Sequence, residues 1–194
     1  MEGPAKPRQA ASVIVLRGGG EALEVLLLRR NPTSRFMGGA WVFPGGAVDA
    51  QEGAGDVSHR IAAVREVEEE AGLRLPDPKA LVKFSRWITP PQLAIRFDTH
   101  FFLAHAPPDQ EPRPDGEEMV DLGWHTPAGA LAAHRRGELE LVFPTIKQLE
   151  QLAGFGSASE LVEWATGREV VAVEPHVQIT GETARVVLPG EPGY

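Results

Sequence analysis

The sequence of 194 residues contains no cysteine. Disulfide bonds, thiolate metal sites and cysteine nucleophiles are therefore all excluded. The sequence also lacks an apolar run of membrane-spanning length, and residues 1–4 lack the hydrophobic core of a signal peptide. These absences predict a cytoplasmic protein with no membrane partner.

Positive charge is scarce relative to negative charge. The chain has 19 lysine and arginine residues against 27 aspartate and glutamate residues, which gives a formal net charge of -8. This imbalance disfavours broad electrostatic binding to nucleic acid, so an acidic substrate would need local arginines and a metal ion to hold it. With 42% hydrophobic residues the chain can form one core, and we predict a single domain over residues 1–194.

Hydrophobic periodicity predicts a mixed α/β protein. Alternating or continuous apolar stretches predict strands over residues 11–17, 24–30, 41–43, 81–88, 95–104, 119–125, 170–173, 176–180 and 184–188. Helical spacing predicts helices over residues 57–71, 127–136, 144–153 and 159–166. Turns are expected at 18–20 and 181–182, and a polar loop at 107–116. Strands around one early helix, with further helices later, predict a layered α/β sandwich.

The helix predicted over residues 57–71 carries the most informative cluster of charges. At about 100° of rotation per residue, Glu66, Glu69 and Glu70 fall within one arc of roughly 100°. Glu66 and Glu70 form a like-charge pair, which costs about a few tenths of a kcal/mol unless it is neutralised. A bound divalent cation would neutralise it. The opposite, apolar side of the helix is expected to hold Ile61, Val64, Val67, Glu68 and Ala71.

An ordinary solvent-exposed helix face is the alternative interpretation of this cluster. Arg65 with Glu69, and Glu70 with Arg74, have the four-residue spacing of surface ion pairs, which contribute little to stability. The neighbouring residues favour a functional site instead. A Phe-Pro-Gly-Gly turn at 43–46 precedes the helix, and a Gly-Leu pair ends it.

At these residues the chain resembles the nudix hydrolase family. The sequence box of that family reads Gly, five free positions, Glu, seven free positions, then Arg-Glu-aliphatic-any-Glu-Glu-any-Gly-aliphatic. Gly46 and Glu52 have the first spacing, and residues 65–73 supply the whole second half. Twelve residues instead of seven separate Glu52 from Arg65, and we place this extension in the glycine-rich residues 52–58. The extension leaves the role of Glu52 open.

The resemblance implies both a fold and a chemistry. It implies an α/β/α sandwich with a central mixed sheet, with the box at about residues 45–73 and residues 127–194 as a C-terminal extension. It also implies that Mg²⁺ or Mn²⁺ is bound, because hard oxygen ligands suit these ions. The implied ligands are Glu66, Glu69, Glu70 and the Gly45 carbonyl. Gly46 would let the backbone approach the metal and a phosphate closely.

The resemblance also implies catalytic roles. Glu69 or Glu70 would orient or deprotonate a water molecule, while Arg65 would anchor the carboxylates. A base from a distant loop is an alternative that the family uses, and Glu117 and Glu118 are the candidates in this sequence. These two residues would equally fit a solvent-exposed loop of an acidic protein.

A second pattern, upstream of the box, resembles the coenzyme A diphosphatase branch of the family. In register with that signature are Leu26, Leu27, Arg30, Arg35, Gly39 and residues 43–46, whereas Leu28 replaces its Thr and Asn31 replaces its Ser or Ala. Arg30 and Arg35 are fork-shaped donors suited to the 3′-phosphate or the diphosphate of coenzyme A. Surface charge is the alternative role for them. Residues 87–102 also resemble the peroxisomal members, although residues 192–194 are no peroxisomal targeting tripeptide.

These patterns predict a metal-dependent hydrolase that cleaves coenzyme A or its thioesters to 3′,5′-ADP and 4′-phosphopantetheine or its acyl derivative. One alternative keeps the chemistry but acts on ADP-ribose, a nucleoside diphosphate sugar or a dinucleoside polyphosphate. Another is a catalytically silent domain that senses a nucleotide. The expected partner is a small nucleoside diphosphate-linked molecule and not nucleic acid. Residues 154–194 are expected to cover a sheet edge or to form a homodimer contact.

Overall fold

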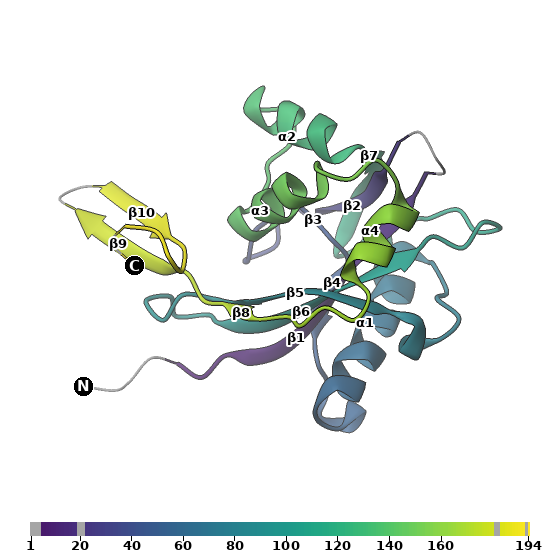
Figure 1. Ribbon diagram of the computed structural model, residues 1–194, viewed down its shortest axis with the longest axis horizontal. Coiled ribbons are helices and arrows are strands. Elements are labelled where there is room, and N and C mark those ends of the chain that lie inside the picture. The colour runs from purple at the N-terminus through teal and green to yellow at the C-terminus, as the bar shows by residue number, and fades with distance from the viewer. Residues whose placement is uncertain (1–4, 19–21, 181–182, 193) are drawn as a thin grey trace.

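The computed structural model describes residues 5–18, 22–180, 183–192 and 194. Within them a central mixed sheet has helix α1 (Asp56–Ala71) on one face. The helices α2 (Pro127–Arg135), α3 (Phe143–Leu152) and α4 (Ala158–Ala165) lie on the other face (Figure 1). This arrangement confirms the predicted α/β/α sandwich. Residues 19–20 and 181–182 of the two predicted turns lie outside the described residues.

The sheet has the strand order β3-β2-β1-β6-β5-β8, while β4 pairs with β1 and β7 pairs with β2. The strands are β1 (Arg8–Arg17), β2 (Glu24–Arg30), β3 (Trp41–Val42), β4 (Gly45–Ala47), β5 (Val82–Ile88), β6 (Phe97–His105), β7 (Met119–His125) and β8 (Ala172–Val173). Strand β1 runs parallel to β6, and β5 runs parallel to β8. The remaining pairs in the sheet are antiparallel, so the predicted mixed sheet is confirmed.

Strand β1 forms the centre of the core. Its side chains are buried at every position from Ala10 to Leu16, as expected for a strand that is covered on both faces. Because successive side chains alternate across a strand, Ile14 and Leu16 pack toward α2–α4 while Val13 and Val15 pack toward α1. The two faces of one strand therefore contribute to two separate hydrophobic clusters.

Two helix ends follow from local sequence. Gly72 ends α1 in a left-handed conformation at φ 66°, and its N–H donates to the Glu68 carbonyl, the backbone arrangement that glycine tolerates best. At the start of α2, the Thr126 side chain accepts a hydrogen bond from the Gly129 N–H, and Pro127 follows it. Both boundaries were predicted from these residue types. Two short 3-10 helices, η1 (Ala50–Glu52) and η2 (Pro78–Ala80), flank α1 in the chain.

The predicted apolar side of α1 is confirmed for Val64, Val67 and Ala71, which pack against the core, but it is wrong for Ile61 and Glu68. Ile61 is 39% exposed, and Glu68 is exposed and pairs with Arg74 at 2.8 Å. The buried face of α1 consists instead of Ser58, His59, Ala62, Ala63, Val67, Glu70 and Ala71. The small alanine side chains let the helix approach the sheet closely, so packing and not side-chain size decides which face is buried.

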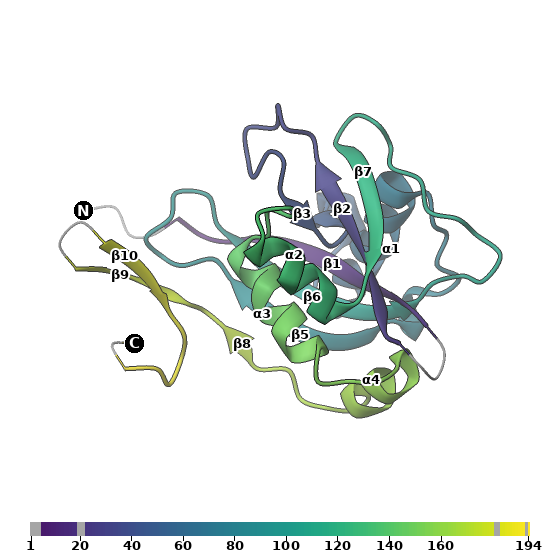
Figure 2. The same ribbon diagram turned by 90° about the horizontal axis from the view of Figure 1, so that it is seen from above.

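The C-terminal extension covers one edge of the sheet. Strand β8 pairs with β5, where Arg86 is opposite Ala172, which is one of the two roles expected for residues 154–194. Beyond it, β9 (His176–Thr180) and β10 (Thr183–Val187) form a separate two-stranded sheet that projects from the body (Figures 1 and 2). Among the described residues, no helix is both long and apolar enough to span a bilayer.

We predict that Leu27→Ala lowers the free energy of unfolding by about 2–5 kcal/mol, because it leaves a cavity in a close-packed core. Leu27 is 0% exposed and lies in the cluster between the sheet and α2–α4. Leu93→Ala, at a side chain that is 47% exposed, should change this free energy by less than about 0.5 kcal/mol. Urea denaturation measures both values, and equal losses would contradict the assigned core.

Candidate active site

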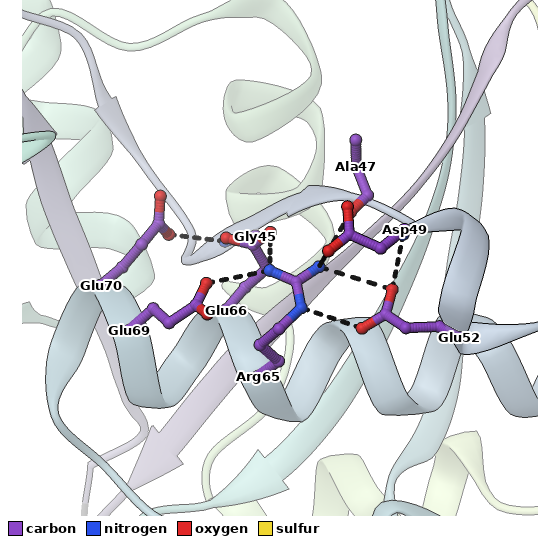
Figure 3. Close-up of polar contacts among 8 residues, drawn as sticks. All are labelled: Gly45, Ala47, Asp49, Glu52, Arg65, Glu66, Glu69 and Glu70. Atoms are coloured by element: carbon purple, nitrogen blue, oxygen red, sulfur yellow. Dashed lines mark hydrogen bonds and ion pairs between the residues drawn. The ribbon is translucent and has the colours of Figure 1, made fainter.

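The guanidinium of Arg65 connects the two halves of the sequence box (Figure 3). On its own helix, its Nη1 donates to Glu66 Oε1 at 2.7 Å and to Glu69 Oε2 at 2.9 Å. On the preceding segment, its Nε donates to Glu52 Oε1 at 2.9 Å and its Nη2 to the Ala47 carbonyl at 3.0 Å. A planar fork with several donors suits such a junction better than a point charge. The predicted pairing of Arg65 with Glu69 is therefore present.

Glu52, whose role the sequence left open, belongs to this network. Its side chain is 7% exposed, and its Oε2 accepts a hydrogen bond from the Asp49 N–H at 2.6 Å. Burial acts to raise the pKa of Glu52, but the hydrogen bonds from Arg65 and Asp49 outweigh it and lower the pKa. The extra residues loop outward through Gly53 and Gly55, which adopt φ 87° and 80°, so the longer spacing still brings Glu52 to Arg65.

Glu70 lies in a different environment from Glu69 on the same helix. It is 4% exposed, and its Oε2 accepts a hydrogen bond from the Gly45 N–H at 2.8 Å. Burial raises the pKa of Glu70 to about 8, against the opposing effect of the Gly45 hydrogen bond. Burial likewise raises the pKa of Glu66, although Arg65 opposes the rise. The predicted Glu70–Arg74 pair is absent from the ion pairs of the described residues.

Close packing in the protein itself limits the space at the double glycine of the box. Strand β4 pairs with β1, with Gly45 opposite Ser12. A Cβ on Gly45 would lie 2.5 Å from the Ala11 carbonyl oxygen, and one on Gly46 would lie 2.3 Å from Glu66 Oε1. Glycine is therefore needed at Gly45, where the neighbouring atoms are backbone. At Gly46 a Cβ would displace the Glu66 carboxylate from its position beside Arg65.

A cavity of about 220 Å³ gathers the acidic side chains. It is lined by Glu66, Glu69, Glu70, Asp115, Glu117 and Glu118. The structure thus places both candidate loop glutamates beside the helix carboxylates, 47 or more positions away in the sequence. Asp115 was missed by the sequence reasoning. An Asp before a Gly at a turn is a signal for side-chain acceptance of backbone N–H groups, and it would have indicated this residue.

This donor set has the chemistry that Mg²⁺ or Mn²⁺ requires, because it consists of carboxylate oxygens. In the part of the chain that the structure describes, no three acidic or histidine side chains converge as they would around a metal ion. Glu66 and Glu69 are turned toward Arg65, and Glu70 toward Gly45. To hold an ion together, Glu66 and Glu69 would have to turn from Arg65 and Glu70 from the Gly45 N–H.

The two predicted phosphate-binding arginines lie at the end of β2 and in the loop after it. Arg30 is partly buried and its Nε has no hydrogen-bond partner within the described residues, while Arg35 is exposed. Neither forms an ion pair with another described residue. A buried guanidinium nitrogen without a partner is costly, and an oxygen of a bound phosphate would satisfy it once the Arg30 side chain turned to expose this atom.

The family model of the NUDIX domain matches residues 6–145. The chain belongs to the NUDIX family. Among its relatives, the acyl-coenzyme A diphosphatase NUDT19 of Homo sapiens is 26% identical, with an alignment that covers 99% of this chain and 81% of the human protein. The putative nudix hydrolase 7 of Caenorhabditis elegans is 29% identical over 75% of this chain and 60% of its own length.

Solved structures agree with this assignment. The crystal structure of a NUDIX hydrolase from Alicyclobacillus acidocaldarius has a TM-score of 0.72 and 28% sequence identity to this protein. The superposition covers 81% of this chain and 96% of the other one. The NUDIX fold and the box geometry together identify a hydrolase of diphosphate anhydride bonds.

The raised pKa of Glu70 makes the stability of the metal-free NUDIX protein depend on pH. The folded state favours the protonated carboxyl, so this stabilisation is complete below the ordinary pKa near 4.5 and is lost as the pH rises through about 8. Glu70→Gln keeps an acceptor for the Gly45 N–H and has no charge to bury. We predict that the Tm of this variant minus that of the wild type increases between pH 5 and pH 9.

Differential scanning calorimetry in the presence of a chelator measures this difference. Glu68→Gln, at an exposed glutamate of the same helix, is the matched control and should show a nearly constant Tm difference over the same range. A Tm difference for Glu70→Gln that does not change with pH would show that Glu70 is charged throughout.

Proposed function

We propose that this NUDIX hydrolase cleaves the diphosphate of coenzyme A or acyl-coenzyme A, with Mg²⁺ or Mn²⁺ as its cofactor. The observation that carries the substrate class is Arg30, a partly buried arginine with an unsatisfied Nε, which lies in register with the coenzyme A signature. The named activity of the human relative supports the same substrate. The products would be 3′,5′-ADP and 4′-phosphopantetheine or its acyl derivative.

The carboxylates of α1 would divide metal binding and water activation between them according to their environments. Glu66, Glu69 and Glu70, with the Gly45 carbonyl, would hold the metal, which when bound neutralises the diphosphate and lowers the pKa of a water molecule. The Glu69 side chain is 58% exposed, so it can reach a water molecule as well. Arg65 orients Glu66 and Glu69 through its hydrogen bonds to both.

The loop glutamates offer a second location for the general base. Glu117 and Glu118 line the same cavity as the helix carboxylates, so a proton taken up there would remain within the site. The complete set of box carboxylates favours catalysis over a silent nucleotide sensor. The cytoplasmic location and the homodimer stay predictions from the sequence.

Glu69→Gln should lower kcat by about 100-fold or more, as expected when a catalytic carboxylate is neutralised. Its exposed position means that the fold should survive, which circular dichroism checks. Glu68→Gln is the matched control because Glu68 faces away from the cavity and pairs with Arg74, and it should retain wild-type turnover.

The substrate panel for this measurement contains coenzyme A, an acyl-coenzyme A, ADP-ribose, a nucleoside diphosphate sugar and a dinucleoside polyphosphate, each with Mg²⁺ and with Mn²⁺. Preferential cleavage of coenzyme A or its thioester supports the proposal. If ADP-ribose is cleaved while coenzyme A is not, the substrate assignment is wrong. If no compound is cleaved with either ion, the proposal is wrong and the alternative of a nucleotide sensor gains support.

Arg30→Gln and Arg35→Gln should each raise the KM for coenzyme A about 10- to 100-fold, the range expected from losing a hydrogen bond to a charged group worth about 1.5–3 kcal/mol. Comparing the KM for coenzyme A with that for 3′-dephospho-coenzyme A shows which phosphate each arginine binds. An arginine that binds the 3′-phosphate affects only coenzyme A, whereas one that binds the diphosphate affects both compounds. Arg135→Gln, at an exposed position on α2, is the control, and an equal effect there would mean that Arg30 and Arg35 are not specific ligands.

A further inference from the structure

The loop before β7 is shaped by the carboxylate of Asp115. Its Oδ1 accepts hydrogen bonds from the N–H groups of Glu117 at 2.5 Å and Glu118 at 2.7 Å, and its Oδ2 accepts one from Met119 at 3.2 Å. The Gly116 N–H closes the turn by donating to the Met119 carbonyl at 2.9 Å. Three successive backbone groups are therefore held on one carboxylate, which fixes the peptide planes around Glu118.

The same loop is held from its other side by Asn31, at the end of β2. The Asn31 N–H donates to the Glu118 carbonyl at 2.7 Å, and its Nδ2 donates to the Glu117 carbonyl at 2.8 Å. Its Oδ1 in turn accepts hydrogen bonds from the N–H and the hydroxyl of Thr33. All these contacts lock the amide in one orientation, so the backbone carbonyls before and after the Cα of Glu118 are both fixed.

Asn31 is also one of the two positions at which the chain departs from the coenzyme A signature. A Ser at this position would carry its only donor on the Cβ, and an Ala would carry none. Only a side chain of the length of Asn bridges to the Glu117 carbonyl while it accepts hydrogen bonds from Thr33. The side-chain bridge to the loop is therefore a feature of this chain and not of the signature.

Of the two loop glutamates, Glu118 is the one whose preceding and following carbonyls are both held by Asn31. Burial is the main cause of the raised pKa values of Glu66 and Glu70, and the charge of Glu118 adds to both. Glu118 and these two residues line one cavity. The orientation of the Glu118 backbone thus determines how the Glu118 carboxylate points into this cavity.

We propose that Asn31 is a positioning residue that, together with Asp115, directs Glu118 into the carboxylate site. This inference rests on the proposed hydrolase function. Asn31 follows Arg30 directly, so the residue proposed to bind a substrate phosphate and the residue that holds the Glu118 loop share one strand end. The bridge therefore fixes Glu118 relative to the phosphate that Arg30 binds. A displacement of about 1 Å in such a group can cost on the order of 100-fold in rate.

Asn31→Ala and Asn31→Asp test this role. Both lose the donor to Glu117, while the Asp variant keeps an acceptor for Thr33. Both should lower kcat at least about 10-fold and leave KM within about twofold, because Arg30 is unchanged. Thr33→Val is the matched control: it removes the hydroxyl contact to Asn31 but leaves the bridge to Glu117, and it should retain wild-type kcat.

A double-mutant cycle with Glu118→Gln distinguishes positioning from general damage to the fold. If Asn31 acts through Glu118, Asn31→Ala lowers kcat in the wild type but adds nothing further in the Glu118→Gln background. If Asn31→Ala lowers kcat equally in both backgrounds, or if Glu118→Gln leaves kcat unchanged, the inference is overturned.

Hydrogen exchange of the Glu117, Glu118 and Met119 amides in the metal-free protein gives a readout without turnover. Exchange should be faster in Asn31→Ala than in Thr33→Val, with the Tm of both near that of the wild type; unchanged exchange would refute the bridge.

The proposed function and the proposed role of Asn31 can be refuted independently of each other. Failure of the wild type to cleave coenzyme A or its thioester would contradict the proposed function, whereas an active wild type with a fully active Asn31→Ala would contradict only the role of Asn31.

Discussion

The site depends on one interaction, the contact of the Arg65 guanidinium with three segments of the box. It holds Glu66 and Glu69 on α1, the Ala47 carbonyl at the end of β4, and Glu52 on η1. Without this cation, several carboxylates would repel one another in a partly buried space. Because a guanidinium keeps its charge at any ordinary pH, the anchor stays constant while the carboxylates around it titrate.

Around this anchor, the two neighbouring glutamates Glu69 and Glu70 acquire different properties. Glu69 is largely exposed and paired with Arg65, whereas Glu70 is buried against β4 and has a pKa raised to about 8. Environments that differ this much between adjacent carboxyl groups are a general basis for dividing roles in catalysis. Gly45 permits this arrangement, because a Cβ there would collide with the β1 backbone while its N–H donates to Glu70.

Sequence periodicity predicted where the strands and helices lie better than it predicted which of their faces are buried. Strand β1 and the end of α1 at Gly72 follow from an apolar run and from a residue suited to a left-handed cap, and both are local properties. The buried face of α1 was predicted correctly at Val67 and Ala71 but wrongly at Ile61, because the helical spacing was centred too far toward that residue. In the folded protein the alanines contact the sheet and Ile61 faces solvent, a choice that depends on how closely two elements can approach.

The sequence by itself determined the chemistry of the site, because Arg65, Glu66, Glu69 and Glu70 lie within two turns of one helix, and their mutual placement needs no other element. The remaining residues of the site are identified only by the tertiary structure. Glu52 reaches Arg65 through an extended loop, and Asn31 reaches Glu117 across 86 positions of the chain. Contacts of this kind depend on strand pairing and on the paths of the loops, which leave no periodic signal in the sequence. For that reason the site was recognised from its helix, while the residues that complete and orient it became visible only in the fold.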